Sequence, residues 1–325
     1  MTRLDLDAED TSAGARLQSL LQLPGCLIMP GVYDALTAKL AERAGFSALY
    51  LTGSGVSYTQ LGRPDLSYVG LRDMVDRAWA LTGAVSIPIL ADADTGYGGP
   101  LNVIQTIREY ERAGLAGAQI EDQQFPKRCG HYADHHLVTT DEMIAKIRAA
   151  TDARRDAAFQ IVARTDARSA HGVDEAIRRA QAYAAAGADV IFVEALLTRE
   201  EMQSVTASVS VPTMANMVEG GQTPILSAAE LSDLGYRAAI FPNAVARSAA
   251  FGVAGVLAEL RATGSTRSYL SRMFDFDQIS DVVGLSEALV AEARYDTAGS
   301  PPGTTTQQDP LASDDEPVGV DRGRE

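Results

Sequence analysis

Short apolar runs alternate with amphipathic stretches along most of the chain. Several of the amphipathic stretches end in Ala-Gly turns, as at Ala113-Gly114 and Ala186-Gly187, where glycine relieves a left-handed helix C-cap. This alternation is typical of parallel strands joined by crossover helices. The apolar runs that we interpret as strands are Cys26–Pro30, Ala48–Leu51, Ile87–Ala91, Ala118–Ile120, Phe159–Ala163, Val190–Val193, Thr213–Ala215 and Ala238–Phe241.

Eight runs of strand type, without a dinucleotide-type glycine fingerprint, favour an α/β fold of the (β/α)8 TIM-barrel type over an open doubly wound sheet. Residues 15–296 are predicted to form this barrel together with a C-terminal helical extension. After an eighth helix over residues 248–263, a further helical pattern spans 277–295. A barrel does not need this helix, so we expect it to pack on another surface, such as a neighbouring subunit.

The two ends of the chain have a different composition. Residues 1–14 are polar and aperiodic and are interpreted as a flexible arm, and residues 297–325 as a disordered acidic tail rich in Pro, Gly, Thr and Asp. Such segments bury too little apolar surface to offset the entropy of ordering. Little chemistry is expected from either end.

Charge narrows the class of partner. The net charge of −15 argues against a nucleic-acid or membrane surface, because phosphates and anionic lipids attract basic faces. No run approaches the roughly 18–20 apolar residues of a membrane helix, and residues 1–10 are acidic where a signal peptide would be basic. We therefore expect a cytoplasmic protein that binds a small molecule. Its two cysteines make no disulfide framework.

Polar residues follow the predicted strands, where the active sites of such barrels lie. Asp92 and Asp94 are two apart, so in extended backbone both would point the same way, and with Glu121 they would offer hard oxygen ligands to Mg²⁺. The alternative is that the aspartates cap a turn. Arg164 and Glu194 at neighbouring strand ends favour a site, because packing rarely needs charges there.

The loop after the fourth strand carries the second cysteine. Cys129 lies among Lys127, Arg128 and His131, cations and an imidazole that would lower the pKa of its thiol and help it exchange a proton. Gly130 gives the loop freedom to move as a lid. The alternative is a surface cysteine in a basic loop. Cys26, in an apolar strand, is interpreted as core.

Two glycine-containing segments are open to two interpretations. Residues 51–56, which include Ser54 and Gly55, either present N–H groups and hydroxyls to a carboxylate or form a tight strand-to-helix turn. Residues 216–221, beginning at Asn216, are either a substrate loop or a plain glycine turn.

Taken together, several motifs over about residues 25–295 resemble the isocitrate lyase/phosphoenolpyruvate mutase superfamily. They are Pro30-Gly31-Val32-Tyr33-Asp34-Ala35, Gly62-Arg63-Pro64-Asp65, Asp92-Ala93-Asp94-Thr95-Gly96-Tyr97-Gly98, Ile120-Glu121-Asp122-Gln123, Lys127-Arg128-Cys129-Gly130-His131, Ala163-Arg164-Thr165-Asp166 and Ala215-Asn216-Met217-Val218-Glu219.

The resemblance implies a barrel whose extra C-terminal helix is swapped between subunits of a homotetrameric dimer of dimers. It implies Mg²⁺, with Mn²⁺ as a substitute, held by Asp92 and Asp94, while Asp65 and Glu121 support its waters. The Cys129 loop would close over the substrate, and the thiol would protonate the enolate left by C–C cleavage. The residues implied in substrate contact are Tyr33, Ser54, Gly55, Arg164, Glu194 and Asn216.

Within the superfamily, the loops at 122–131 and 219–224 resemble methylisocitrate and 2-alkylmalate lyases and differ from phosphonopyruvate-forming mutases, which lack the cysteine. Carboxyphosphonoenolpyruvate mutases share these motifs closely. Gly53-Ser54-Gly55-Val56 departs from methylisocitrate lyases, which typically show Ser followed by consecutive glycines. The substrate therefore stays open between dicarboxylates and tricarboxylates.

The expected function is Mg²⁺-dependent cleavage of a 2-hydroxy di- or tricarboxylate to a 2-oxo acid such as pyruvate and a second carboxylate. Tyr33 or a water held by Glu121 would take the hydroxyl proton. The alternatives are a carboxyphosphonoenolpyruvate-type mutase, an oxaloacetate hydrolase, and a catalytically silent barrel that serves as a scaffold.

Overall fold

The computed structural model describes residues 11–127 and 136–295. Cys129, Gly130 and His131 lie outside the described residues, as do most of the predicted N-terminal arm and the whole of the predicted tail. The predictions made for them therefore rest on sequence.

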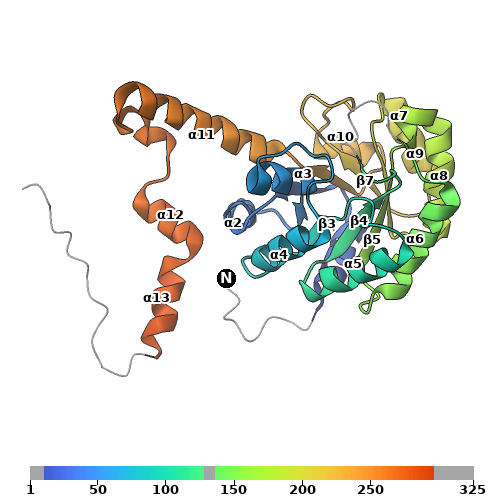
Figure 1. The fold of residues 1–325 in the computed structure, drawn as a ribbon, viewed down its shortest axis with the longest axis horizontal. Coiled ribbons are helices and arrows are strands. Elements are labelled where there is room, and N and C mark those ends of the chain that lie inside the picture. The colour runs from blue at the N-terminus through green and yellow to red at the C-terminus, as the bar shows by residue number, and fades with distance from the viewer. Residues whose placement is uncertain (1–10, 128–135, 296–325) are drawn as a thin grey trace, which may run out of the picture. The chain divides into compact units, whose positions relative to one another are not determined.

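Eight parallel strands close into a barrel in sequence order, from β1 beside β2 round to β8 beside β1 (Figure 1). Each of the eight apolar runs contains or overlaps one strand, so the predicted barrel is confirmed. The strands are β1 Leu27–Val32, β2 Leu49–Leu51, β3 Ile89–Asp92, β4 Gly117–Glu121, β5 Gln160–Thr165, β6 Val190–Val193, β7 Thr213–Asn216 and β8 Ala238–Phe241.

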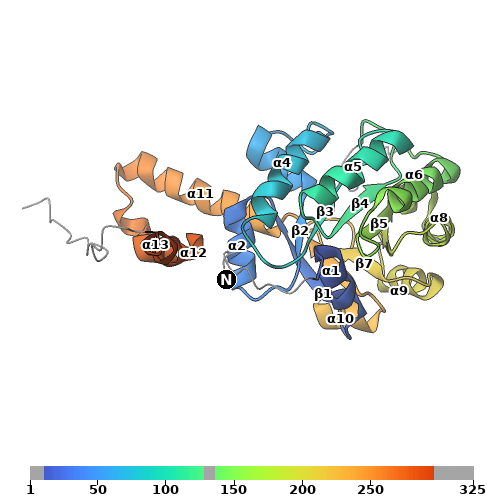
Figure 2. The same ribbon diagram turned by 90° about the horizontal axis from the view of Figure 1, so that it is seen from below.

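Helices surround the strands, and the two views of the ribbon show α4, α5, α6 and α8 on the outside of the barrel (Figures 1 and 2). Side chains fix several helix starts: Asp34, Thr139 and Ser227 form capping boxes at α2, α6 and α10. The α-helices are α1 Ala13–Gln22, α2 Ala35–Arg43, α3 Gly53–Val56, α4 Leu71–Thr82, α5 Pro100–Arg112, α6 Thr140–Ala153, α7 Ala167–His171, α8 Val173–Ala185, α9 Arg199–Ser208, α10 Ala228–Asp233, α11 Ala244–Thr263, α12 Phe276–Val283 and α13 Leu285–Ala293; η1 is a π-helix over Ser57–Leu61 and η2 a 3-10 helix over Arg267–Arg272.

Apolar side chains fill the barrel. One buried cluster joins Tyr50, Val162 and Phe192 on the strands to Leu17 and Leu21 of α1. A larger cluster lies between the strands and the outer helices. Because the interior is packed, a ligand site in this barrel lies at a rim and not in the centre.

The helical segment beyond the barrel differs from prediction. The single helix expected over 277–295 is two helices, α12 and α13, separated by Gly284. Gly284 has φ +83°, a left-handed conformation that glycine adopts at little cost and that ends the first helix. Contacts divide the chain at this glycine, with one unit up to Val283 and another from Gly284 onward.

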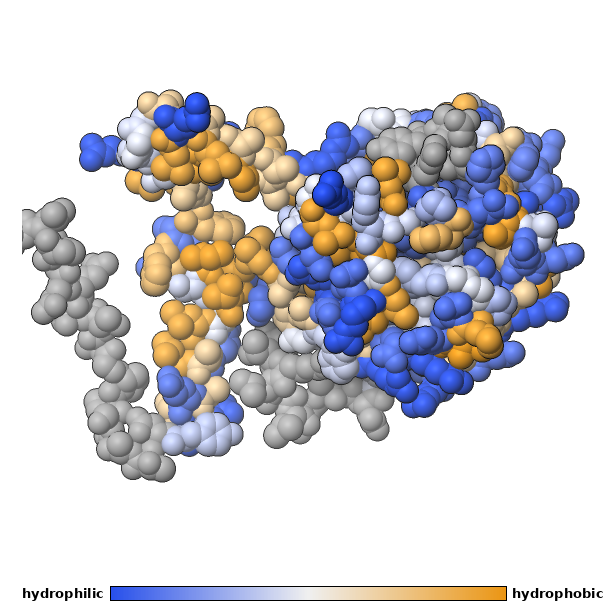
Figure 3. Space-filling view, viewed as in Figure 1, coloured by the Kyte–Doolittle hydropathy of each residue, from blue (hydrophilic) through white to orange (hydrophobic). Residues whose placement is uncertain are grey.

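In the first unit, α12 packs on α2 and Arg43 pairs with Asp281. Large apolar side chains of α11, among them Phe251 and Leu257, are exposed, and apolar surface is visible over this helix (Figure 3). The described residues include no helix with the length and hydrophobicity to cross a bilayer.

Candidate active site

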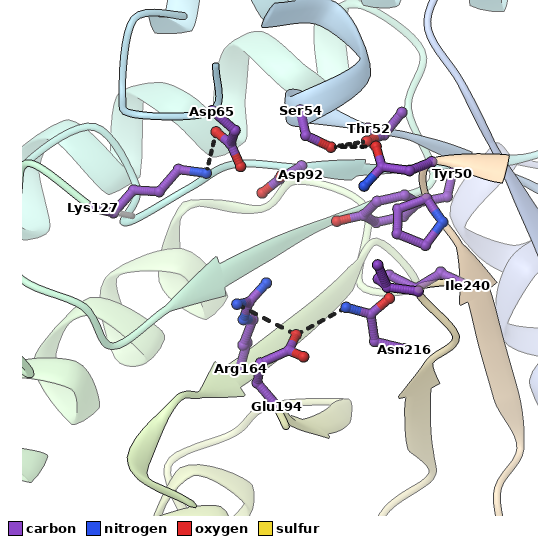
Figure 4. A pocket seen from close by; sticks show the side chains of 13 residues that line it. Tyr50, Thr52, Ser54, Asp65, Asp92, Lys127, Arg164, Glu194, Asn216 and Ile240 are labelled. Carbon is purple, nitrogen blue, oxygen red and sulfur yellow. Dashed lines mark hydrogen bonds and ion pairs between the residues drawn. The ribbon is translucent and has the colours of Figure 1, made fainter. Parts of the chain in front are cut away.

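A cavity lies at the carboxyl ends of the strands, where the sequence placed the polar residues (Figure 4). Tyr50 and Ile240, which belong to the interior core, form part of its wall. Figure 4 shows Arg164, Glu194 and Asn216 on one side of it and Asp65, Asp92 and Lys127 on the other. The lining residues are Tyr50, Thr52, Ser54, Asp65, Asp92, Lys127, Arg164, Glu194, Asn216, Val218, Ile240, Pro242 and Asn243.

Arg164 is fixed by carboxylates on several sides. Its Nε and Nη2 donate to the two oxygens of Asp166 at 3.0 and 2.8 Å, and it pairs with Glu121 at 3.5 Å and Glu194 at 3.3 Å. Burial by itself lowers the pKa of the guanidinium, but these carboxylates raise it well above its ordinary value. The guanidinium also lies 5.1 Å from the centre of the Phe192 ring. Arg164 therefore presents a permanent, oriented positive charge to the cavity.

Glu194 and Asn216 form a second fixed pair at the ends of β6 and β7. The Asn216 amide nitrogen donates to Glu194 Oε2 at 2.9 Å, and the backbone N–H of Ala195 donates to Glu194 Oε1 at 3.1 Å. The Asn216 amide oxygen is buried and has no partner. A buried acceptor without a donor is costly, so a hydroxyl donor from a ligand would be stabilised there.

Ser54 belongs to a hydroxyl cluster after β2. Its Oγ donates to Asn243 Oδ1 at 2.8 Å and lies 3.0 Å from Thr52 Oγ1, which accepts the N–H of Gly55. A Cβ at Gly55 would lie 2.5 Å from the Thr52 methyl group, so glycine allows the turn to close. Residues 51–56 are thus a strand-to-helix turn, as one interpretation held, and Ser54 also lines the cavity.

The backbone at Asp92 and Asp94 differs from the extended geometry that we predicted. Asp92 ends β3, but Asp94 has φ +47°, and its N–H donates to Asp92 Oδ1 at 3.0 Å in a tight turn. The turn is held from outside, because Tyr110 donates to the Asp92 carbonyl at 2.7 Å and Lys146 to the Thr95 carbonyl at 2.9 Å. The carboxylates are therefore placed by a turn and not by strand alternation.

Lys127 contacts two of the four predicted metal-binding carboxylates. Its Nζ lies 2.7 Å from Asp65 Oδ1 and 2.9 Å from Asp94 Oδ1, and the side chain is 4% exposed. Burial raises the pKa of Asp94 to about 7, although Lys127 opposes the shift. From the sequence we expected Lys127 to lower the pKa of the Cys129 thiol. In the structure, the Lys127 ammonium pairs with two carboxylates.

The residues fit a divalent cation in chemistry and charge. Asp65, Asp92, Asp94 and Glu121 are hard oxygen donors with limited exposure, and Glu121 Oε1 is buried without a partner. Among the described residues, no three carboxylate, imidazole or thiol groups converge closely enough to hold an ion as they stand. The donors are thus present, with a lysine ammonium between two of them.

Four predicted site residues are not among those that line the cavity: Tyr33, Gly55, Asp94 and Glu121. Tyr33 follows β1 and is buried, and burial together with Asp34 raises the pKa of its phenol. Cys26 lies just before β1 and is half-buried against the core, not in it. Burial raises the pKa of its thiol to about 12, which supports its interpretation as unreactive.

A buried network behind Arg164 was not predicted. Asp122 Oδ2 accepts hydrogen bonds from Thr165 at 2.7 Å, Arg179 at 2.9 Å and Tyr183 at 2.8 Å, and its Oδ1 accepts the N–H of Asp166 at 3.0 Å. The network ties the ends of β4 and β5 to α8. A sequence signal was available, because Arg179 lies on the buried face of an amphipathic helix, where a cation needs a partner.

Residues 17–261 match the family model described as phosphoenolpyruvate phosphomutase. The chain is 42% identical over 286 residues to a 2,3-dimethylmalate lyase of Eubacterium barkeri, a match that covers 88% of this chain and 99% of the relative. It is 41% identical over 271 residues to a 2-methylisocitrate lyase of Aeropyrum pernix, covering 83% and 87%.

Solved structures of proteins with related names are also similar to this chain. A 2,3-dimethylmalate lyase structure superposes with a TM-score of 0.84 at 38% identity, covering 90% of this chain and 98% of that one. An oxaloacetate acetylhydrolase with 3,3-difluorooxalacetate gives 0.82 at 35%, covering 87% and 97%. A phosphonopyruvate hydrolase with oxalate and Mg²⁺ gives 0.80 at 31%, covering 88% and 99%.

Proposed function

This chain belongs to the phosphoenolpyruvate mutase/isocitrate lyase superfamily, and from that premise we propose that it is a metal-dependent carbon–carbon lyase. Its substrate would be a 2-hydroxy di- or tricarboxylate of the 2-alkylmalate or methylisocitrate type. The products would be a 2-oxo acid, such as pyruvate, and a second carboxylate. The names of two relatives, 2,3-dimethylmalate lyase and 2-methylisocitrate lyase, support this class of reaction.

One observation carries the proposal: the cavity combines a carboxylate-rich wall with a wall that holds the fixed Arg164 guanidinium and the unpartnered Asn216 amide oxygen. Asp65 and Asp92 line one side, and Arg164 and the Asn216 amide line the other. A 2-hydroxy acid needs both, because its carboxylates require cations or donors and its hydroxyl must lose a proton as the C–C bond breaks. The fixed geometry of Arg164 suits the developing oxyanion.

The metal would be Mg²⁺, with Mn²⁺ as a substitute. Asp92 and Asp94 would hold it, and Asp65 and Glu121 would hold its waters. When bound, the ion would act as a Lewis acid toward the 2-oxygen and the adjacent carboxylate of the substrate. The related phosphonopyruvate hydrolase was solved in complex with oxalate and Mg²⁺, which supports this choice of ion.

Substrate contacts follow from the lining. Arg164 would bind a carboxylate, and the amide oxygen of Asn216, held in place by Glu194, would accept a hydrogen bond from the substrate hydroxyl. Ser54 with Gly55 would contact the remaining polar groups. The Asn216 amide oxygen, buried without a partner, supports this assignment. Tyr33 would contact the substrate after the cavity rearranges around it.

Two proton transfers complete the reaction. A water held by Glu121 would remove the hydroxyl proton and pass it to the Glu121 carboxylate. We favour this route over Tyr33 because Glu121 Oε1 has no partner, whereas burial raises the pKa of the Tyr33 phenol. The electron pair of the broken C–C bond passes to the departing carboxylate as an enolate. Cys129 would then give its proton to that carbon, with Lys127 and His131 as its neighbours in sequence and Gly130 giving the loop its freedom.

Oxaloacetate hydrolysis is the second candidate, supported by the likeness to oxaloacetate acetylhydrolase. The test is an assay of purified protein with Mg²⁺ against 2,3-dimethylmalate, methylisocitrate, oxaloacetate and a phosphonate, read by proton and phosphorus NMR. We expect release of a 2-oxo acid from one of the first two. Oxalate and acetate from oxaloacetate would favour the second candidate, and conversion of a phosphonate without a 2-oxo acid would identify a mutase.

A further inference from the structure

Lys127 places a buried ammonium group among the carboxylates to which we assign the metal. Its Nζ contacts Asp65 and Asp94 at 2.7 and 2.9 Å, and only 4% of the side chain is exposed. The backbone is fixed as well, because Ser67 donates to the Lys127 carbonyl at 3.2 Å. This lysine is therefore a built part of the site and not a surface side chain that happens to lie nearby.

The carboxylates need a cation. Asp65 and Asp94 share one ammonium, Asp92 lies two residues from Asp94, and Glu121 is buried beside Arg164. Buried like charges at such separations repel strongly unless a counter-charge is present. A divalent ion would satisfy the same oxygens, because it binds hard carboxylate donors.

We propose that Lys127 is the protein's own counter-ion in this site, and that a divalent cation and the Lys127 ammonium compete for Asp94 and Asp65. Both cations cannot keep these contacts, since an ion bound to the Asp94 carboxylate would lie within a few ångströms of the ammonium. Metal binding therefore displaces Lys127 from its two carboxylates. Lys127 therefore stabilises the metal-free site and lowers the affinity of the site for metal.

The proposal rests on the metal-dependent function given above, but it concerns binding and not turnover. A lysine that only helped to hold the metal or its waters would have the opposite effect on affinity when removed. A lysine that served only the thiol of Cys129 would have no effect on affinity. The sign of the change in metal affinity therefore distinguishes the three roles.

The experiment measures Mn²⁺ binding by electron paramagnetic resonance and Mg²⁺ binding by calorimetry, without substrate. Lys127→Met is compared with the wild type and with Lys39→Met, which removes the same charge from α2, outside the cavity lining. We expect Lys127→Met to bind both ions at least about tenfold more tightly, because a nearby positive charge is gone. Lys39→Met should match the wild type. Unchanged or weaker binding by Lys127→Met would overturn the proposal.

A second measurement uses the wild-type protein, in case Lys127→Met does not fold. The chain has three lysines, Lys39, Lys127 and Lys146, so acetylation by acetic anhydride can be followed at each by mass spectrometry. Saturating Mg²⁺ should speed acetylation of Lys127, since it loses two ion pairs, and leave Lys39 unchanged. Equal protection of Lys127 with and without Mg²⁺ would contradict displacement.

The two hypotheses fail separately. If Lys127→Met bound metal more tightly but the wild type cleaved no hydroxy acid, the competition would be retained and the lyase rejected. Cleavage by the wild type together with unchanged metal binding by Lys127→Met would retain the lyase and reject the competition.

Discussion

Arg164 is the residue whose contacts define the cavity most completely. Its planar guanidinium makes two bonds to Asp166 and also reaches Glu121 and Glu194. A lysine keeps the charge but cannot reproduce these directions. We therefore expect Arg164→Lys to lower kcat/KM by about 100-fold or more, the size expected when an oriented donor to a developing charge is lost.

The matched control is Arg168→Lys, because Arg168 makes a similar two-bond pair with Glu201 outside the cavity lining. Steady-state kinetics of both variants on the cleaved acid test the difference. Equal losses in the two variants would show that Arg164 supports folding and not the reaction.

The two cysteines should differ sharply in reactivity. Burial raises the pKa of Cys26 to about 12, so very little of its thiol is ionised at pH 8. Cys129 has basic neighbours in sequence and should react quickly with a disulfide reagent. A thiol titration of the native protein should show one fast thiol, lost in Cys129→Ser and kept in Cys26→Ser. A fast Cys26, or two equally slow thiols, would be incompatible with this assignment.

For single residues, the sequence predicted where a side chain lies in the fold better than which groups it contacts. Arg164, Glu194 and Asn216 line the cavity as expected, because the ends of parallel barrel strands meet at one rim. It did not predict the turn at Asp94 or the pairing of Lys127, since both depend on which distant groups meet in the fold. Asp65 and Lys127 are 62 residues apart.

Among the elements, β4, β5 and α8 depend on a shared buried carboxylate. Asp122 accepts bonds from three side chains and from the Asp166 N–H, and it is almost fully buried. Asp122→Asn would leave Arg179 with only the more exposed Glu175 as a carboxylate partner and should cost about 3 kcal/mol of unfolding free energy. Tyr183→Phe removes one hydrogen bond and should cost about 1 kcal/mol.

Urea denaturation measures both changes, with Asp76→Asn as the control. Asp76 pairs with Arg72 on an exposed face of α4, so its loss should cost under about 0.5 kcal/mol. If Asp122→Asn unfolded at the same urea concentration as Asp76→Asn, the network would not hold these elements together.

Element prediction succeeded where periodicity was strong. The eight apolar runs predicted all eight strands, but five strand ends were placed too early. Four of these strands end in a polar residue: Asp92, Glu121, Thr165 or Asn216. Backbone pairing in a barrel continues through such residues, since it does not depend on side-chain polarity. The helix over 277–295 was predicted as one because its apolar periodicity continues past Gly284, whose left-handed backbone breaks it.

For the whole molecule, we expect the exposed apolar side chains of α11 to form a subunit interface. Phe251 is 75% exposed and Leu257 58%, which is unfavourable for large apolar groups left in water. We expect light scattering to give a mass of about four times 34.5 kDa, and Phe251→Asp with Leu257→Asp to lower it. A monomeric wild type would contradict the predicted dimer of dimers.

A single chain limits what sequence can predict at this scale. The barrel follows from repetition along the chain, whereas a swapped helix depends on a surface of a second copy. Likewise, the resemblance gave the reaction class, but the substrate depends on a cavity wall in which Val218, Ile240 and Pro242 set the shape. Neither feature has a periodic signal in the sequence.

The most direct test of the lyase assignment is to run the reaction in D₂O with Mg²⁺ and the cleaved hydroxy acid, followed by NMR. C–C cleavage with protonation of the released carbon by Cys129 predicts one equivalent of 2-oxo acid and one of the second carboxylate. That carboxylate should carry one deuterium at the carbon that left. Cys129→Ser should abolish most of this turnover while it still binds Mg²⁺. Release of no 2-oxo acid from any hydroxy acid, or full activity of Cys129→Ser, would contradict the account.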